Sequence, residues 1–151
     1  MNNANGHRKI AIEEHFMAPD FVDYWSKTAI NISPALFGKA REALQDFGEM
    51  RLANMDRNNI EKAVLSLAGP GVQAEPQTAT AVRMARRCNE FLAEQISKRP
   101  QRYAGFAHLA MQDPAAAASE LERCVSELGF CGAMINGQTN GAYLDDDRFS
   151  V

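Results

Sequence analysis

Short apolar runs alternate with amphipathic stretches along the chain, and this alternation predicts strands separated by helices. Four runs have the length and the apolar character of buried strands. They comprise residues 9–14, 62–67, 103–109 and 131–136.

Three helices are predicted, one before each of the second, third and fourth strands, from apolar residues at spacings of three and four. The first spans residues 48–58, with Leu52 and Met55 on one side. The second spans residues 76–98, with Pro76 in its first turn. Its buried stripe is expected to contain Ala81, Met84, Ala85, Cys88, Phe91, Leu92 and Ile96.

The third helix begins after Asp113, which suits an N-cap, and has Pro114 in its first position. Gly129 is its predicted C-terminal cap. The stripe expected to be buried consists of Ala118, Leu121, Val125 and Leu128.

Residues 17–47 interrupt the alternation. Pro19, Pro34 and Gly38 break any long helix here, and large apolar side chains lie between them. We expect an extended, partly helical insertion after the first strand, with an apolar cluster of Phe21, Tyr24, Trp25, Phe37 and Phe47.

The order of these elements predicts an α/β fold with parallel strands and right-handed crossovers. A complete (β/α)8 barrel takes about 250 residues, and the chain has 151, with no helix after the fourth strand. We therefore expect four parallel strands in sequence order with helices outside, forming about half of a barrel. Such a half exposes strand edges and an interior face, so the chain on its own is expected to self-associate.

The first strand carries the most suggestive chemistry. Alternate residues of a strand share a face, so Glu13 and His15 should project together, roughly 6–7 Å apart. A carboxylate and an imidazole can bind one divalent ion from there. A surface pair without a ligand is the alternative. Ile10 and Ile12 point the other way and are expected to pack against whatever covers the sheet.

Three other residues are candidates for contact with a substrate, each with a structural alternative. His108, near the end of the third strand, faces a substrate or is hydrogen-bonded in a loop. Asn136, closing the fourth strand, hydrogen-bonds a substrate or forms a turn with Gly137. Arg51 pairs with a substrate carboxylate or is an ordinary ion-paired residue of a helix.

Composition narrows the classes of function. A hydrophobic content of 46% and a net charge of −3 fit one globular core and provide no basic excess for nucleic acid. No apolar stretch reaches the roughly 18 residues of a membrane span. Residues 1–8 are polar, and we expect them to be a flexible N-terminus. Cys88, Cys124 and Cys131 form no CxxC motif and are predicted to be buried thiols in a reducing compartment, the cytoplasm.

Several motifs occur in an order that resembles the N-terminal half of the amidohydrolase superfamily. More narrowly, they resemble its aromatic-acid decarboxylases, which include the γ-resorcylate, 2,3-dihydroxybenzoate and 5-carboxyvanillate enzymes and relatives of aminocarboxymuconate semialdehyde decarboxylase. The resemblance extends from Lys9 onward. It rests on Ala11–Phe16 with Pro19, Arg51–Leu52 with Met55–Asp56, Ile60 with Leu65–Leu67, Gln112–Pro114, and Leu128–Phe130 with Asn136–Gly137.

The resemblance implies that residues 9–151 are the N-terminal half of a (β/α)8 barrel with one divalent metal ion, zinc or manganese. Glu13 and His15 match the Glu-x-His ligands of this branch. The other family ligands, a histidine from a strand beyond the fourth and an aspartate from the last strand, have no counterpart in this chain. That aspartate is also the family's usual proton donor, so the catalytic acid is unknown here.

The implied activity is non-oxidative decarboxylation of a hydroxylated aromatic carboxylic acid by a carbon–carbon lyase. In the full-length parent we expect a homo-oligomer. Because fold and metal do not fix a reaction, a hydrolase of a lactone or amide is one alternative. A non-catalytic fragment that lacks the second half of the site is the other.

Overall fold

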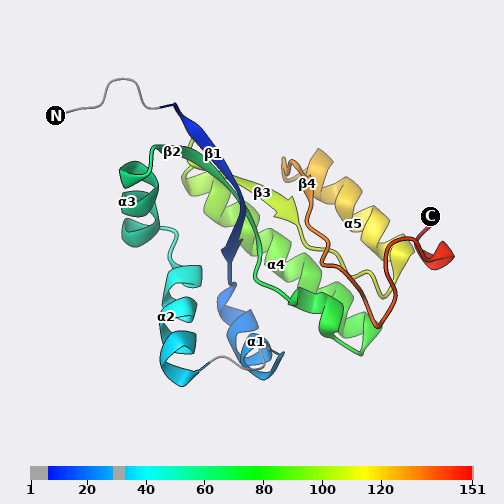
Figure 1. Ribbon diagram of the computed structural model, residues 1–151. Coiled ribbons are helices and arrows are strands. Elements are labelled where there is room, and N and C mark those ends of the chain that lie inside the picture. Colours follow the sequence, from blue (N-terminus) through cyan, green and yellow to red (C-terminus); the bar gives the residue numbers. More distant parts are fainter. Residues whose placement is uncertain (1–6, 29–32, 151) are drawn as a thin grey trace.

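The computed structural model describes residues 7–28 and 33–150 and contains one four-stranded sheet (Figure 1). The strands lie in chain order, and every neighbouring pair is parallel. The predicted α/β fold with four parallel strands is thus confirmed. Most of the predicted flexible N-terminus, residues 1–6, lies outside the described residues. The strands are β1 (Lys9–Phe16), β2 (Ile60–Leu67), β3 (Tyr103–Ala107) and β4 (Gly132–Ala133).

Helices cover the sheet as the alternation predicts. Figure 1 shows α4 (Thr78–Lys98) running along the sheet, α5 (Pro114–Ser126) beside β4, and α3 (Glu49–Arg57) near β2. Helix α4 begins two residues later than expected. The Glu75 carboxylate accepts the Gln77 N–H at 2.9 Å, which keeps Pro76 outside the helix. No helix in the described part of the chain has the length and hydropathy that crossing a bilayer requires.

The insertion after β1 is partly helical, as predicted. A 3-10 turn (Pro19–Phe21) leads into α1 (Val22–Thr28), and α2 (Pro34–Gln45) follows. The Trp25 ring stacks on Phe37 with centroids 4.8 Å apart. Its Nε1 donates to the Gly69 carbonyl at 3.0 Å. The indole therefore fastens the insertion to the loop after β2.

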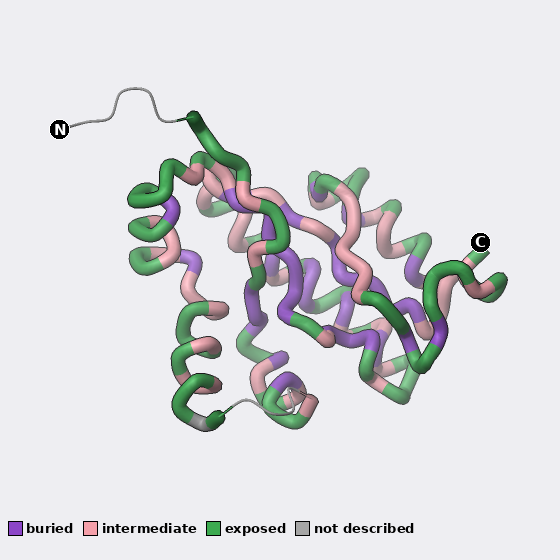
Figure 2. The backbone as a smooth tube through the Cα atoms, in the orientation of Figure 1, coloured by how far each residue is buried: buried purple, intermediate pink, exposed green. Residues whose placement is uncertain are grey.

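The core lies between the sheet and α4, where the buried segments meet in Figure 2. An aromatic cluster joins the insertion, the sheet and the helix: Phe47 lies 6.0 Å from Phe16, 5.7 Å from Phe91 and 5.9 Å from Tyr103, between ring centroids. The Tyr103 hydroxyl donates to the Phe47 carbonyl at 2.9 Å. Removing one such ring typically costs about 3–5 kcal/mol.

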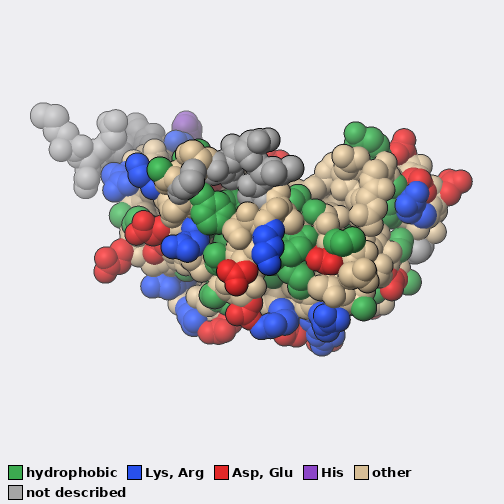
Figure 3. Space-filling view, turned by 90° about the horizontal axis from the view of Figure 1, so that it is seen from below, with side chains coloured by type: hydrophobic (Ala, Val, Ile, Leu, Met, Phe, Trp, Pro, Cys, Tyr) green, Lys and Arg blue, Asp and Glu red, His purple; other side chains and the backbone are tan. Residues whose placement is uncertain are grey.

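On the face seen in Figure 3, acidic and basic side chains are interspersed.

The cap of α5 is confirmed, but its predicted buried stripe is wrong by one residue. Asp113 accepts the Ala116 N–H at 3.0 Å, and Gly129 has a φ of +70°. Ala118 and Val125 are exposed, whereas Ala117 and Cys124 are buried. Both stripes have helical spacing and share Leu121 and Leu128. The observed one brings the small alanine and cysteine side chains against the rest of the fold.

Three expectations about exposed positions are corrected. Cys131 is exposed, although Cys88 and Cys124 are buried and burial raises the pKa of both thiols to about 12. Ile10 and Ile12 are 67% and 64% exposed, because β1 is an edge strand and no described element covers them.

Strand β4 is much shorter than predicted. It ends at Ala133, and the last bond to β3 runs from the Met134 N–H to the Ala107 carbonyl at 3.0 Å. Beyond that point the Gln73 side chain, rather than a strand, engages the main chain of Asn136.

Candidate metal and substrate site

Strand β1 contains a bulge where the metal ligands were predicted. Ala11 pairs with Ala63 and Glu14 with Leu65, so three steps in β1 oppose two in β2. Glu13 lies in the bulge with a φ of +60°, which is uncommon for a residue with a side chain. The regular alternation assumed along this strand is therefore interrupted at Glu13. Bulges redirect side chains and occur often beside active sites.

Glu13 and His15 are both exposed and line one open groove of about 770 Å³ between β1 and the α2–α3 segment. The His15 Nδ1 lies 3.0 Å from the hydroxyl of Ser66, its partner on β2. That hydroxyl also lies 3.4 Å from the Glu14 carbonyl, to which it can only donate. A hydroxyl has one proton, so when that proton is donated to the Glu14 carbonyl, the hydroxyl oxygen accepts from Nδ1–H. This tautomer leaves the His15 Nε2 lone pair available to a metal ion.

Arg51 supports the end of β1 from α3. Its Nη2 donates to the His15 carbonyl at 2.8 Å, and its Nε donates to the Asp46 carbonyl at 2.7 Å. The Glu14 carboxylate lies 3.8 Å from Nη1. Burial lowers the pKa of this guanidinium. The nearby Tyr103, Glu14 and Asp46 partly oppose that shift. These contacts match the ion-paired alternative, and contact with a substrate carboxylate stays a prediction.

His108 is buried directly after β3. Its Nε2 accepts the Val72 N–H at 2.8 Å, and burial lowers its pKa to about 4. The loop that donates this bond passes so close that a Cβ on Gly71 would lie 2.2 Å from the imidazole Cε1. The ring is thus a neutral acceptor in a loop, which matches the hydrogen-bonded alternative, and contact with a substrate stays a prediction.

Asn136 is half-buried after β4 and lines a cavity of about 320 Å³ with Pro70 and Gln73. Its main-chain N–H donates to Gln73 Oε1 at 2.7 Å, and its Nδ2 donates to the Pro70 carbonyl at 2.9 Å. Among the described residues, none donates a hydrogen bond to its Oδ1. That oxygen is an acceptor available to a ligand.

Two buried polar residues went unnoticed in the sequence. Gln73 follows β2 and holds Asn136, and Asn89 on α4 holds the main chain of His108. Asn89 also donates to the Glu120 carboxylate on α5. Burial raises the pKa of that carboxyl group, but hydrogen bonds from Arg123 and Asn89 outweigh burial and lower the pKa. The available sequence clue was Asn89 itself, a polar residue directly after Cys88 in an apolar stripe.

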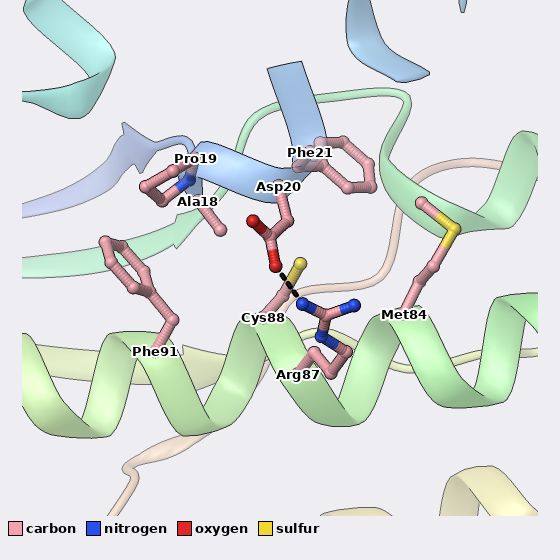
Figure 4. A pocket seen from close by; sticks show the side chains of 8 residues that line it. All are labelled: Ala18, Pro19, Asp20, Phe21, Met84, Arg87, Cys88 and Phe91. Atoms are coloured by element: carbon pink, nitrogen blue, oxygen red, sulfur yellow. Dashed lines mark hydrogen bonds and ion pairs between the residues drawn. The ribbon is translucent and has the colours of Figure 1, made fainter. Parts of the chain in front are cut away.

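The candidates form two groups at the carboxyl ends of the strands. Glu13, His15 and Arg51 gather at β1, while His108 and Asn136 are linked through the loop after β2. Within residues 7–28 and 33–150, no three His, Cys, Asp or Glu side chains gather as a metal site. A separate apolar cavity of about 180 Å³ is lined in part by the ion-paired Asp20 and Arg87 and by none of the candidates (Figure 4).

Parallel strands in chain order, outer helices and polar side chains at the carboxyl ends define a protein of the βα-barrel type. Residues 12–150 match the family described as Amidohydrolase, and the chain belongs to this family. The predicted resemblance is thereby confirmed.

The most similar proteins include decarboxylases. The chain is 46% identical over 137 residues to a γ-resorcylate decarboxylase of Rhodococcus jostii, an alignment covering 91% of this chain and 41% of the relative. A solved 2,6-dihydroxybenzoate decarboxylase complexed with 2,6-dihydroxybenzoate has a TM-score of 0.87 and 39% identity, covering 95% of this chain and 45% of that one.

A second solved structure, dihydroxybenzoic acid decarboxylase from Polaromonas sp., holds manganese and the inhibitor 2-nitroresorcinol. It has a TM-score of 0.85 and 42% identity, covering 95% of this chain and 44% of that chain. The chain spans less than half the length of these relatives.

Proposed function

We propose that the native polypeptide carrying this chain is a metal-dependent carboxy-lyase that decarboxylates a hydroxylated aromatic carboxylic acid, in the cytoplasm and as a homo-oligomer. The similarity to decarboxylases of dihydroxybenzoates supports the reaction. The observation that carries the proposal is the hydrogen bond between the Nδ1 of His15 and Ser66, in a groove that Glu13 also lines. A metal-binding histidine commonly has its other ring nitrogen held in this way.

Glu13 and His15 would supply two ligands to one divalent ion, and their oxygen and nitrogen donors suit manganese or zinc. Manganese is the ion bound in the Polaromonas relative. When bound, the ion supplies a Lewis acid and a positive charge for the carboxylate and phenolate of the substrate. Two ligands leave the coordination shell incomplete, so residues 1–151 alone should hold the ion weakly.

Asn136 would orient the substrate by accepting a hydrogen bond from a ring hydroxyl at Oδ1. In the reaction, the bond between the ring and the carboxylate breaks and its electron pair stays on the ring carbon. That carbon takes a proton from an acid while CO2 leaves. We do not assign the acid to a residue of this chain. Arg51 and His108 would act through the His15 carbonyl and the Val72 N–H that they engage.

The test supplies manganese and 2,6-dihydroxybenzoate to the native polypeptide and measures CO2 release and metal content after dialysis. We expect Glu13→Ala and His15→Ala to lose both. Glu14→Gln is the matched control, because this neighbouring carboxylate faces Arg51, and it should keep its metal. Unchanged metal in both alanine variants would refute the site. Turnover of a lactone or amide without CO2 would favour the hydrolase.

A further inference from the structure

Two buried side-chain amides hold the residues that follow β3 and β4. Asn89 Oδ1 accepts the His108 N–H at 2.9 Å, and its Nδ2 donates to the His108 carbonyl at 3.0 Å. In the same way, Gln73 Oε1 accepts the Asn136 N–H at 2.7 Å, and Gln73 Nε2 donates to the Asn136 carbonyl at 3.3 Å. Each amide thus occupies the main-chain groups that a neighbouring strand would otherwise bind.

The two clamps, Asn89 on the main chain of His108 and Gln73 on the main chain of Asn136, are connected. The His108 Nε2 accepts the N–H of Val72, the residue before Gln73. Gln73 is 3% exposed, and its Nε2 also donates to the buried Thr139 hydroxyl at 2.7 Å. Asn136 is therefore fixed through its main chain by Gln73 and through its Nδ2 by Pro70, with Oδ1 left over.

We propose that Gln73 is a positioning residue of the substrate site. It fixes the main chain of Asn136 so that Oδ1 meets a ring hydroxyl of the substrate, and Asn89 supports it by fixing His108. This inference rests on the proposed function. An amide buried only for packing would stabilise the fold without acting through the Asn136 side chain.

A double-mutant cycle distinguishes the two roles. In the manganese-loaded native polypeptide, Gln73→Met removes the clamp with little change in side-chain length. We expect the dissociation constant for 2,6-dihydroxybenzoate to rise about tenfold, as for the loss of one hydrogen bond. In the Asn136→Ala background the same substitution should have no further effect. Gln138→Met is the matched control, because Gln138 is exposed in the same loop and only its carbonyl meets Gln73.

Hydrogen exchange at the Asn136 amide gives a readout that does not depend on the substrate. We expect faster exchange in Gln73→Met and unchanged exchange in Gln138→Met. Unchanged exchange in Gln73→Met overturns the clamp. Faster exchange with an unchanged dissociation constant, or additive effects in the cycle, overturns the positioning role. Failure of the unsubstituted protein to bind the dihydroxybenzoate overturns the proposed function, and is seen before any variant is made.

Discussion

Under the proposed function, Ser66 fixes the ring nitrogen through which His15 would bind a metal ion. The serine is 1% exposed, and its hydroxyl lies 3.0 Å from the His15 Nδ1 and 3.4 Å from the Glu14 carbonyl. The hydrogen bond to Nδ1 also orients the imidazole. Residues in this supporting position commonly change metal affinity 10- to 100-fold when removed.

We therefore expect Ser66→Ala to weaken manganese binding by the native polypeptide about tenfold or more. Titration against a competing chelator measures the change. Ser97→Ala is the control, since Ser97 is exposed on α4 and bonds only the Glu94 carbonyl. Equal affinities of Ser66→Ala and the unsubstituted protein would contradict the assignment of the His15 tautomer.

His108 should make stability depend on pH. Burial lowers its pKa from 6.5 to about 4, so the unfolded chain binds a proton that the folded chain excludes. Where the unfolded state binds more protons, stability rises with pH. The stability contributed by the neutral form of His108 is present above pH 6.5 and is lost as the pH falls toward 4. Between pH 7 and pH 5 the loss is about 2 kcal/mol.

Denaturant unfolding of the unsubstituted protein and of His108→Gln at several pH values tests this linkage. Between pH 7 and pH 5, the free energy of unfolding of the glutamine variant should fall by about 2 kcal/mol less than that of the unsubstituted protein. The range stays above the ordinary pKa of carboxylates, so groups such as Glu120 contribute little to the difference. Parallel curves for the two proteins would show that His108 does not titrate as described.

The identity of the candidate residues was predictable, but their geometry was not. Glu13 and His15 stand out by spacing and by resemblance to the Glu-x-His motif. The bulge that contains Glu13 depends on pairing with β2, some fifty residues away, and local alternation carries no information about it. Gln73 was missed for the same reason, since its partners Asn136 and Thr139 are distant in the sequence.

At the scale of elements, periodicity predicted the existence of the helices better than their orientation. The apolar stripe of α4 is confirmed, with all seven predicted positions buried or half-buried. For α5, two stripes share Leu121 and Leu128, and packing chose the one containing Cys124. The length of β4 depends on which group bonds the main chain beyond Ala133. That group is the Gln73 side chain, and hydrophobic periodicity does not reveal it.

The N-cap of α5 was predicted from local chemistry alone, and it gives an element-scale test. Asp113 accepts the Ala116 N–H, one of the amides that a helix leaves unpaired. Asp113→Ala should lower the free energy of unfolding by about 1 kcal/mol. Asp145→Ala, in the exposed loop after β4, should change it by less than about 0.5 kcal/mol. Equal stabilities of the two variants in denaturant unfolding would contradict the cap.

At the scale of the whole molecule, the alternation of strands and helices was sufficient to predict the sheet order. What it could not predict is which surfaces lack a cover. Ile10 and Ile12 lie on β1, an edge of the sheet, and each is about two-thirds exposed. An edge strand with exposed apolar side chains is a template for pairing with another chain.

Residues 1–151 expressed alone should therefore self-associate through β1. Burying an isoleucine contributes about 1.5 kcal/mol or more, so Ile10→Lys with Ile12→Lys should raise the apparent dissociation constant about 100-fold. Sedimentation over a range of concentrations measures it. Leu144→Lys is the control, because Leu144 is 53% exposed in the loop after β4 and away from the β1 edge. A monomeric unsubstituted chain would refute the prediction, and association that survives both lysines would place the contact on another surface.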